Sequence, residues 1–353
     1  MGKIRWFRQK RNDPPGRSTA DMPIGERLNQ YTPETLRADS RYAAFGMIVS
    51  LLMGYVCTYA VLLVALPVFA LFSGTESVGF LGMESAFSSP TFIVVVNALA
   101  MVCSTIFSNL IPFSLCRRAA GLREKLCNGL GMPVLYLLGL FPVVLGVNMW
   151  GGFFSSWVSD LMQRMHLVPT EPDFSLPDVP AASILMTLSI VVLAPIFEEY
   201  VFRGVLLRIF QRYGDGFAIL LSGFLFGMAH ANLPQFCSAF PIGLVLGYIA
   251  VRSHSILPTI LLHLGNNLFV TLTTELAFNS VVAGIGSIFN GIISLIPGLG
   301  GLLFIGYKLF LMLEDESGYY CGKRAKILLR SWPVWLMIGL YVLQSLRFLV
   351  WQG

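Results

Sequence analysis

Long stretches without any charged side chain are the dominant pattern of this chain. They cover residues 43–75, 85–116, 126–159, 179–197, 216–251, 253–274, 276–307 and 331–346. A helix of roughly 20 apolar residues crosses the hydrocarbon core of a bilayer, and a helix satisfies its own backbone groups in lipid. The run 216–251 is long enough for two helices, with a turn near Asn232-Leu233-Pro234. The pattern therefore predicts an all-α, polytopic bundle of eight transmembrane helices, with 331–346 as a short ninth that either spans or lies in the interface.

Basic residues gather on one side of this predicted bundle. If the segment before Ala43 is cytoplasmic, all but two of the 24 Lys and Arg residues fall on or near the cytoplasmic side. The two exceptions are Arg164 and Arg347. Cytoplasmic loops carry such an excess of positive charge, so we predict a cytoplasmic N-terminus. The net charge of +5 indicates contact with anionic headgroups rather than with nucleic acid.

Composition supports a membrane protein with a short polar tail. Only 12% of the residues are charged, whereas soluble domains carry about 25%. We expect a polar cytoplasmic tail over 1–41, disordered or on the membrane surface, and a transmembrane domain over 42–353. The outer loop 168–180 holds four prolines and is expected to be extended. The six cysteines show no paired spacing, and packing is their simplest role.

Three groups of polar residues interrupt the later spans, between about 183 and 274. An ionisable residue inside a span costs at least ~2.5 kcal/mol on insertion scales, so it indicates function by default. In the first group, Glu199 and Arg203 stand four apart and can pair on one helix face, which leaves Glu198 free. Pro195, just before this group, removes a helix hydrogen bond and could open a gap accessible to water.

The second and third groups supply two histidines and an amide. His230 ends the segment Phe226-Gly227-Met228-Ala229-His230, and His263 and Asn267 share a helix face four residues apart. Each group alone has an ordinary explanation: a charged helix end, a histidine at the interface, or polar packing between helices. Together they contain a carboxylate base, two imidazoles and an amide, which are the parts needed for hydrolysis by activated water.

The order E-E-x-x-x-R (198–203), F-x-x-x-H (226–230) and H-x-x-x-N (263–267) resembles the CAAX protease and bacteriocin-processing family. That family includes the type II CAAX prenyl endopeptidases, which are intramembrane peptidases. The resemblance implies that Glu198 activates water, helped by His230, and that His263 and Asn267 stabilise the oxyanion. It also implies that Glu199 and Arg203 orient the site, and Glu199 could share in catalysis.

The same resemblance leaves the cofactor open. Glu198, His230 and His263 could together bind zinc, and the family is often described as metalloproteases. The chain has no H-E-x-x-H motif, and a metal-free glutamate mechanism is also argued for the family. We favour chemistry without a cofactor and keep zinc as the alternative. The implied partners are the lipid bilayer and a membrane-associated peptide or protein substrate, in a multi-pass protein of a bacterial cell membrane.

Two other classes of function compete with an intramembrane endopeptidase. A catalytically silent family member would bind and regulate another membrane protein, although it would not need to retain all three motifs. A transporter would use the buried Glu and His residues as a proton relay, but the chain shows no inverted repeat.

Simple alternation of the spans poses a problem for the depth of the site residues in the membrane. It places Glu198 near the cytoplasmic side and His230 near the outer end of its helix, so that helix must be short, tilted or broken, or the predicted boundaries are wrong.

Overall fold

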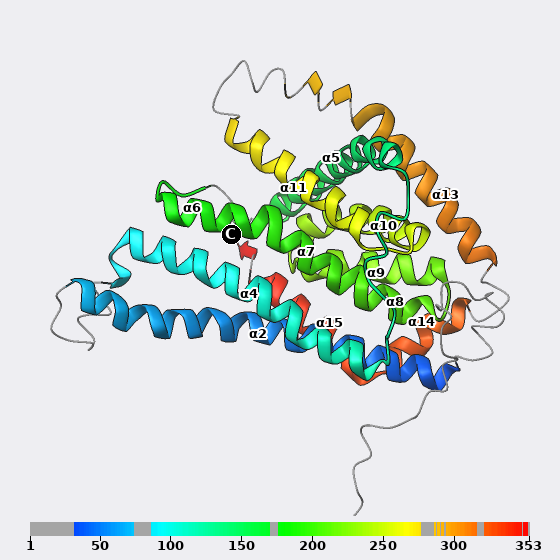
Figure 1. The fold of residues 1–353 in the computed structure, drawn as a ribbon, viewed down its shortest axis with the longest axis horizontal. Helices are drawn as coiled ribbons and strands as arrows, with labels where there is room; N and C mark the ends of the chain where they lie inside the picture. The colour runs from blue at the N-terminus through cyan, green and yellow to red at the C-terminus, as the bar shows by residue number, and fades with distance from the viewer. Residues whose placement is uncertain are drawn as a thin grey trace, which may run out of the picture.

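The computed structural model describes residues 32–73, 86–169, 176–276, 286, 288–289, 291–292, 294–315, 321–347 and 349–351. These residues are almost entirely helical, which confirms the prediction of an all-α, polytopic bundle (Figure 1). The long helices are α2 (Pro33–Ser73), α4 (Pro90–Ala119), α5 (Val134–Arg164), α10 (Leu233–Ser253), α11 (Leu257–Leu276) and α13 (Leu299–Asp315). The shorter ones are α6 (Pro180–Thr187), α7 (Ala194–Glu199), α8 (Leu207–Gln211), α9 (Asp215–Ala229), α14 (Cys321–Leu329) and α15 (Trp332–Leu346). Three π-helical segments complete the helical part: η2 (Leu188–Leu193), η3 (Tyr200–Leu206) and η4 (Ser294–Gly298).

Six helical stretches of the described chain are long and apolar enough to cross a membrane. They are Pro33–Leu71, Pro90–Ala119, Val134–Arg164, Pro180–Gln211, Leu233–Ser253 and Leu295–Glu314. Helices α14 and α15 meet at a bend of 77° and together form a further apolar pair. Helix α9, in the place of the predicted fifth span, is a shorter apolar helix of 15 residues. Helix α11, the predicted seventh span, has 20 residues but carries the polar residues of the third motif.

The first helix begins earlier than the charge pattern predicted. Helix α2 starts at Pro33, inside the segment expected to be a polar tail over 1–41, and Leu36 and Asp39 are buried there. That expectation is therefore wrong for 33–41, while 1–31 lie outside the described residues. The proline-containing loop 168–180 overlaps strand β1 (Leu167–Pro169) at its start and α6 at Pro180, and residues 170–175 lie outside the described part.

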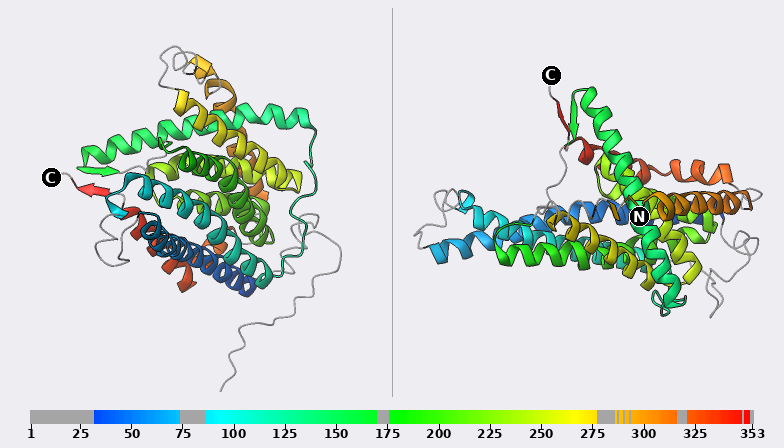
Figure 2. Two further views of the ribbon diagram at one scale, coloured as in Figure 1. Left: turned by 60° about the vertical axis from the view of Figure 1, so that its left-hand side comes forward. Right: turned by 90° about the horizontal axis from the view of Figure 1, so that it is seen from above.

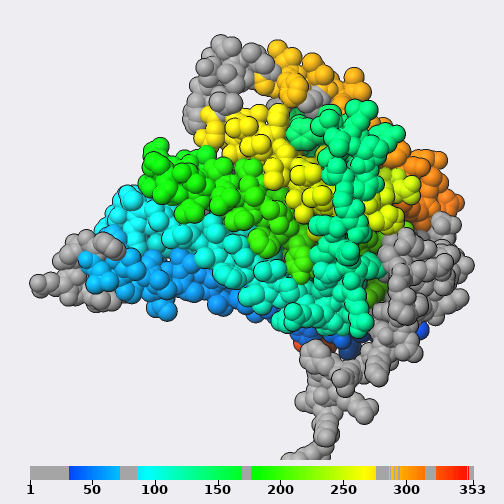
Figure 3. Space-filling model, viewed as in Figure 1, coloured from blue at the N-terminus to red at the C-terminus, as the bar shows by residue number. Residues whose placement is uncertain are grey.

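Helices α2 and α4 pack side by side along one flank of the molecule, and the continuous stretch from α6 to α8 packs beside α4 (Figures 1 and 3). Helix α5 crosses the bundle at a steep angle and packs against α10 (Figure 2). Helices α9 and α10 approach closely because glycines face each other. A Cβ added at Gly243 would lie 2.9 Å from the Cα of Gly223. Small residues at such contacts let membrane helices pack backbone to backbone.

A two-stranded antiparallel ribbon joins the segments that follow α5 and α15. Strand β1 (Leu167–Pro169) follows α5, and strand β2 (Leu349–Trp351) follows α15, with Val168 opposite Val350. The C-terminal ends of α5 and α15 therefore lie at the same side of the molecule. In the predicted topology that side is the outer one, and α15 would then lead towards it from α14.

Candidate active site

The helix that carries the first motif changes between π-helical and α-helical hydrogen bonding near the motif. In η2 the N–H of Ala194 donates to the carbonyl of Ser189, and at the end of η3 the N–H of Leu207 donates to Phe202, both five residues back. Such π-helical turns occur often at functional sites. Short α7 lies between them and carries Pro195, Glu198 and Glu199.

Glu199 and Arg203 form the ion pair that their spacing predicted. The Arg203 Nη1 donates to Glu199 Oε1 at 2.7 Å, and both side chains are fully buried. A second nitrogen of Arg203 donates to the carbonyl of Gly243 on α10 at 3.2 Å, and the guanidinium lies 4.6 Å from the centre of the Phe226 ring. A buried charge needs such partners, and here they tie η3 to both α9 and α10.

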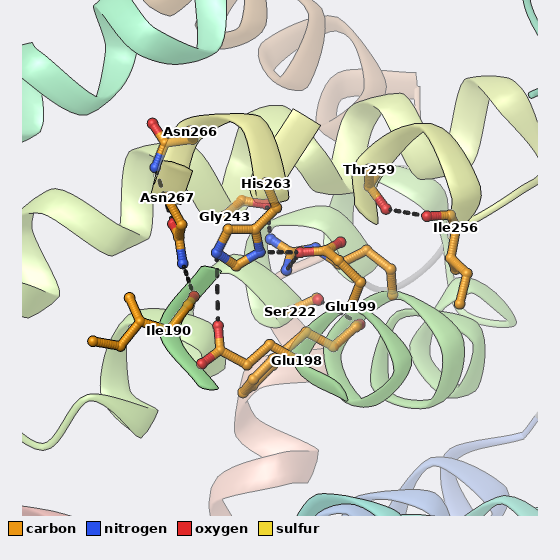
Figure 4. Close-up of polar contacts among 12 residues, drawn as sticks. Ile190, Glu198, Glu199, Ser222, Gly243, Ile256, Thr259, His263, Asn266 and Asn267 are labelled. Carbon is orange, nitrogen blue, oxygen red and sulfur yellow. Dashed lines mark hydrogen bonds and ion pairs between the residues drawn. The ribbon is translucent and has the colours of Figure 1, made fainter. Parts of the chain in front are cut away.

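His263 joins the two adjacent glutamates (Figure 4). Its Nδ1 lies 3.0 Å from Glu199 Oε1, and its Nε2 lies 3.8 Å from Glu198 Oε2. Glu199 is fully buried, whereas 27% of the Glu198 side chain is exposed. Glu199 is bound by Arg203, whereas Glu198 has a longer contact with His263 and remains partly exposed.

Asn267 of the third motif binds the π-helical segment η2 through its side-chain amide. The Asn267 Nδ2 donates to the carbonyl of Ile190 at 2.9 Å, and Asn266 donates to Asn267 Oδ1 at 3.3 Å (Figure 4). In a π-helical register the carbonyl of Ile190 would accept from residue 195, which is a proline without an N–H. Pro195 therefore leaves the carbonyl of Ile190 without a helix donor, as its lack of an N–H predicted. The side chain of Asn267 donates the hydrogen bond to this carbonyl.

The depth problem arises from wrong boundaries. The fourth span does not end at Phe197 but continues to Gln211, so Glu198 lies near the middle of a 32-residue span. Its continuation was missed because Arg203 and Arg208, counted as cytoplasmic charges, are buried. Helix α9 has 15 residues, about 22 Å at 1.5 Å per residue, which is shorter than the hydrocarbon core of about 30 Å. A helix of this length that begins at the predicted cytoplasmic side does not bring His230 to the outer surface.

Glu198 and His230 line one cavity of about 280 Å³. The cavity is lined by α2, α4, α7, η3, the end of α9 and α15, and its polar lining is Ser50, Ser104, Thr105, Ser108, Asn109, Glu198, His230 and Tyr341. The Nδ1 of His230 lies 2.9 Å from the carbonyl of Phe226. Since a carbonyl can only accept, Nδ1 carries the hydrogen and Nε2 is left free for chemistry. Neither His263 nor Asn267 is among the described residues that line this cavity.

A larger cavity does not belong to the site. It measures about 390 Å³ and lies between α5, α10 and the η4–α13 stretch. Its lining is apolar except for Tyr248 and Arg252, and it contains none of the predicted catalytic residues.

The residues named as zinc ligands fit a metal only in part. Both His230 and His263 have Nδ1 next to an oxygen acceptor, as metal-binding histidines do. However, the described part of the chain contains no group of three His, Cys, Asp or Glu side chains close enough to hold an ion. Glu198, His230 and His263 are therefore not assembled as a ligand set in this arrangement.

Sequence reasoning missed two sets of polar residues. The first is the row of Ser, Thr and Asn side chains on α4, because the first three spans carry no charge and match no motif. The second lies at the end of the bundle that the charge pattern predicts to be cytoplasmic. There Asp39 accepts from Arg212 at 3.3 Å and from the hydroxyl of Tyr213 at 2.8 Å. Burial, together with the nearby Asp39 carboxylate, raises the pKa of Tyr213, so its hydroxyl stays a donor.

The fold and the site define a class: a multi-pass helical membrane protein with a carboxylate and two imidazoles inside its bundle. Residues 180–269 match the family model described as type II CAAX prenyl endopeptidase, Rce1-like. This segment runs from α6 into α11 and contains Glu198, Glu199, Arg203, His230, His263 and Asn267. The family resemblance predicted from the motifs is thereby confirmed for this segment.

Two curated proteins are similar to the chain. One is an uncharacterized 24.3 kDa protein of Escherichia coli, 33% identical over 144 residues, which cover 39% of this chain and 61% of that protein. The other is YdiL of Bacillus subtilis (strain 168), whose name marks it as a candidate membrane peptidase. It is 26% identical over 155 residues, which cover 42% of this chain and 62% of YdiL. The chain thus spans about three fifths of the length of the curated relatives it matches. No solved structure matches it.

Proposed function

We propose that the chain is an intramembrane endopeptidase that hydrolyses a membrane-associated peptide or protein. The observation that carries the proposal is the contrast between two neighbouring carboxylates. Glu199 is buried and neutralised by Arg203, whereas Glu198 is partly exposed in a cavity that His230 also lines. In the described part of the chain Glu198 forms no ion pair with Lys or Arg, and its contact with His263 Nε2 is 3.8 Å long. A carboxylate compensated so weakly inside a membrane is costly, and a role as general base accounts for it.

In the proposed reaction Glu198 takes a proton from a water molecule in the cavity. The water oxygen attacks the carbonyl carbon of the peptide bond, and the C–N bond of the tetrahedral intermediate then breaks as the leaving nitrogen receives a proton. Glu198 carries that proton across, and the free Nε2 of His230 helps to align the water. The ring of His263 lies between the two glutamates, with Nδ1 3.0 Å from Glu199 Oε1 and Nε2 3.8 Å from Glu198 Oε2.

Stabilisation of the oxyanion by His263 and Asn267 remains a prediction of the family resemblance. One hydrogen of the Asn267 carboxamide is donated to Ile190, and the other is available for a substrate oxygen. Donors aimed at a developing negative charge are among the largest contributions to hydrolysis. Asn267 would then both fix η2 and contact the intermediate.

The direct test compares membranes from cells that carry the native chain with membranes that carry Glu198→Gln. Glu198→Gln keeps the shape of the side chain and removes the base, so we expect cleavage to fall by about 10²–10⁴-fold. His230→Ala and His263→Ala are expected to abolish cleavage as well, with membrane insertion intact. Products are identified by mass spectrometry, and Glu314→Gln, at the exposed end of α13, is the matched control. Full cleavage by Glu198→Gln would contradict the mechanism.

Metal dependence is tested separately. We expect purified protein to keep its cleavage activity after dialysis against a chelator, because its proposed base is a carboxylate that needs no metal to accept a proton. If activity were lost on chelation and restored by added zinc, the two imidazoles and Glu198 would be zinc ligands instead.

A further inference from the structure

The wall of the cavity that α4 forms has no role in the chemistry proposed so far. Four polar side chains of α4 line this cavity together with Glu198: Ser104, Thr105, Ser108 and Asn109. They occur as two pairs four residues apart, Ser104 with Ser108 and Thr105 with Asn109, so they form one face of the helix. Packing alone does not require four polar groups on one face of a membrane helix.

Most hydrogens of these side chains are already donated in hydrogen bonds within the protein. The hydroxyl of Ser104 donates to Met101 at 3.0 Å, and the hydroxyl of Ser108 donates to the carbonyl of Ser104 at 2.5 Å. The Asn109 Nδ2 donates to the carbonyl of Thr105 at 2.8 Å. Thr105 shares a hydrogen bond of 3.3 Å with Ser189 on η2.

What remains free on this wall is mainly a set of acceptors, together with the second hydrogen of the Asn109 carboxamide. The oxygens of Ser104 and Ser108 keep unused lone pairs, and no hydrogen bond to Asn109 Oδ1 exists in the described part of the chain. Across the cavity, the hydroxyl of Tyr341 likewise donates to Met47 and keeps an acceptor. The described lining contains no Lys or Arg. The wall is therefore suited to groups that donate hydrogen bonds and unsuited to anions.

The spacing of the acceptors matches one edge of an extended peptide. Residues four apart on a helix are about 6 Å apart along its axis. The N–H groups on one edge of an extended strand come from every second residue and are about 6.6 Å apart. Two successive N–H groups of a strand can thus reach two acceptors one helical turn apart on α4.

We propose that this face of α4 is the subsite that binds the N–H edge of the substrate backbone in extended form, with Asn109 Oδ1 as its strongest acceptor. The inference rests on the proposed function and adds to it the conformation of the substrate and the residues that align it. Backbone hydrogen bonds of this kind give affinity without selecting side chains. A substrate residue without an N–H, such as proline or an N-methylated residue, is then disfavoured at the position opposite Asn109.

The test uses a synthetic peptide that spans a cleavage site identified by its dependence on Glu198, with purified protein in lipid nanodiscs. Asn109→Leu removes the acceptor, so we expect KM to rise about 3–10-fold, the value of one hydrogen bond, with kcat within about twofold. Asn97→Leu is the matched control, since Asn97 is an exposed asparagine of the same helix away from the cavity. Ser104→Ala provides a second variant that loses only a hydroxyl bonded within its own helix, and its KM is expected to rise as well.

N-methylation of single backbone nitrogens in the peptide makes the test specific. One methylated position should raise KM for the native protein and for Asn97→Leu, and leave KM of Asn109→Leu unchanged. That loss of sensitivity is expected only if Asn109 contacts the N–H. If every methylated peptide affects native protein and Asn109→Leu equally, the inference is overturned while the proposed function stands. If no Glu198-dependent cleavage site exists, the proposed function fails and the inference fails with it.

Discussion

At the scale of single residues, neighbours of identical chemistry have different tasks because the helix turns about 100° between them. Glu199 points into the bundle, where Arg203 and His263 bind it, and Glu198 points towards the cavity. The Glu199–Arg203 pair could be predicted from sequence because its spacing is local. The contacts of Arg203 with Gly243 and Phe226 could not, since they depend on how α9 and α10 pack.

The buried pair leads to a prediction about stability. Arg203→Met fills the space of the arginine but removes the positive charge beside buried Glu199, which then keeps only its contact with His263. Breaking such a buried pair costs about 3–5 kcal/mol. We expect this variant to unfold at markedly lower temperature in detergent. The double variant Glu199→Gln with Arg203→Met removes both charges and is expected to recover much of the loss. Arg118→Met, at an exposed cation of α4, is the control, and equal stability of all variants would contradict the assigned role of the pair.

At the scale of elements, the order of helices followed from the uncharged runs, but their ends did not. Charges were taken to mark loops, and this assumption shortened the fourth span at Glu198 and the first at Ala43. In the structure Asp39 and Arg203 are inside helices because each has a buried partner of opposite charge. Partners far apart in sequence, such as Asp39 and Arg212, cannot be recognised from one sequence alone.

The π-helical register of η2 leads to a second prediction. Asn267→Leu leaves the carbonyl of Ile190 without a donor, which costs about 1–3 kcal/mol for a buried group. In a Pro195→Ala background, residue 195 regains an N–H that can bond to Ile190, so the same substitution should cost less. Thermal unfolding of the two single variants and the double variant measures this coupling. An equal cost in both backgrounds would show that Asn267 does not replace the missing N–H.

At the scale of the whole molecule, the charge distribution and the β1–β2 ribbon indicate the same topology. The ribbon joins the ends of α5 and α15, and the charge pattern places both ends outside. On the opposite side, Arg212 and Tyr213 bind Asp39, and Arg212 also donates to the carbonyl of Ala120 at 2.9 Å. These contacts join α2, the end of α4 and the turn before α9 on the side predicted to be cytoplasmic.

Labelling of cysteines tests this topology. Cys127 is exposed between α4 and α5, and in a variant where it is the only cysteine we expect a membrane-impermeant maleimide to label it in inverted vesicles but not in intact cells. A single cysteine introduced as D178C, at an exposed position before α6, is expected to show the opposite pattern. The reverse result for both positions would place the N-terminus outside.

The central claim is that Glu198 activates a water molecule inside the membrane to cleave a peptide bond. It is tested most directly by running the reaction in ¹⁸O-labelled water and analysing the new C-termini by mass spectrometry. We predict one ¹⁸O atom in the new carboxylate for the native protein and no labelled product above background for Glu198→Gln. Labelled product formed equally by both proteins, or no labelled product from either, would contradict the account.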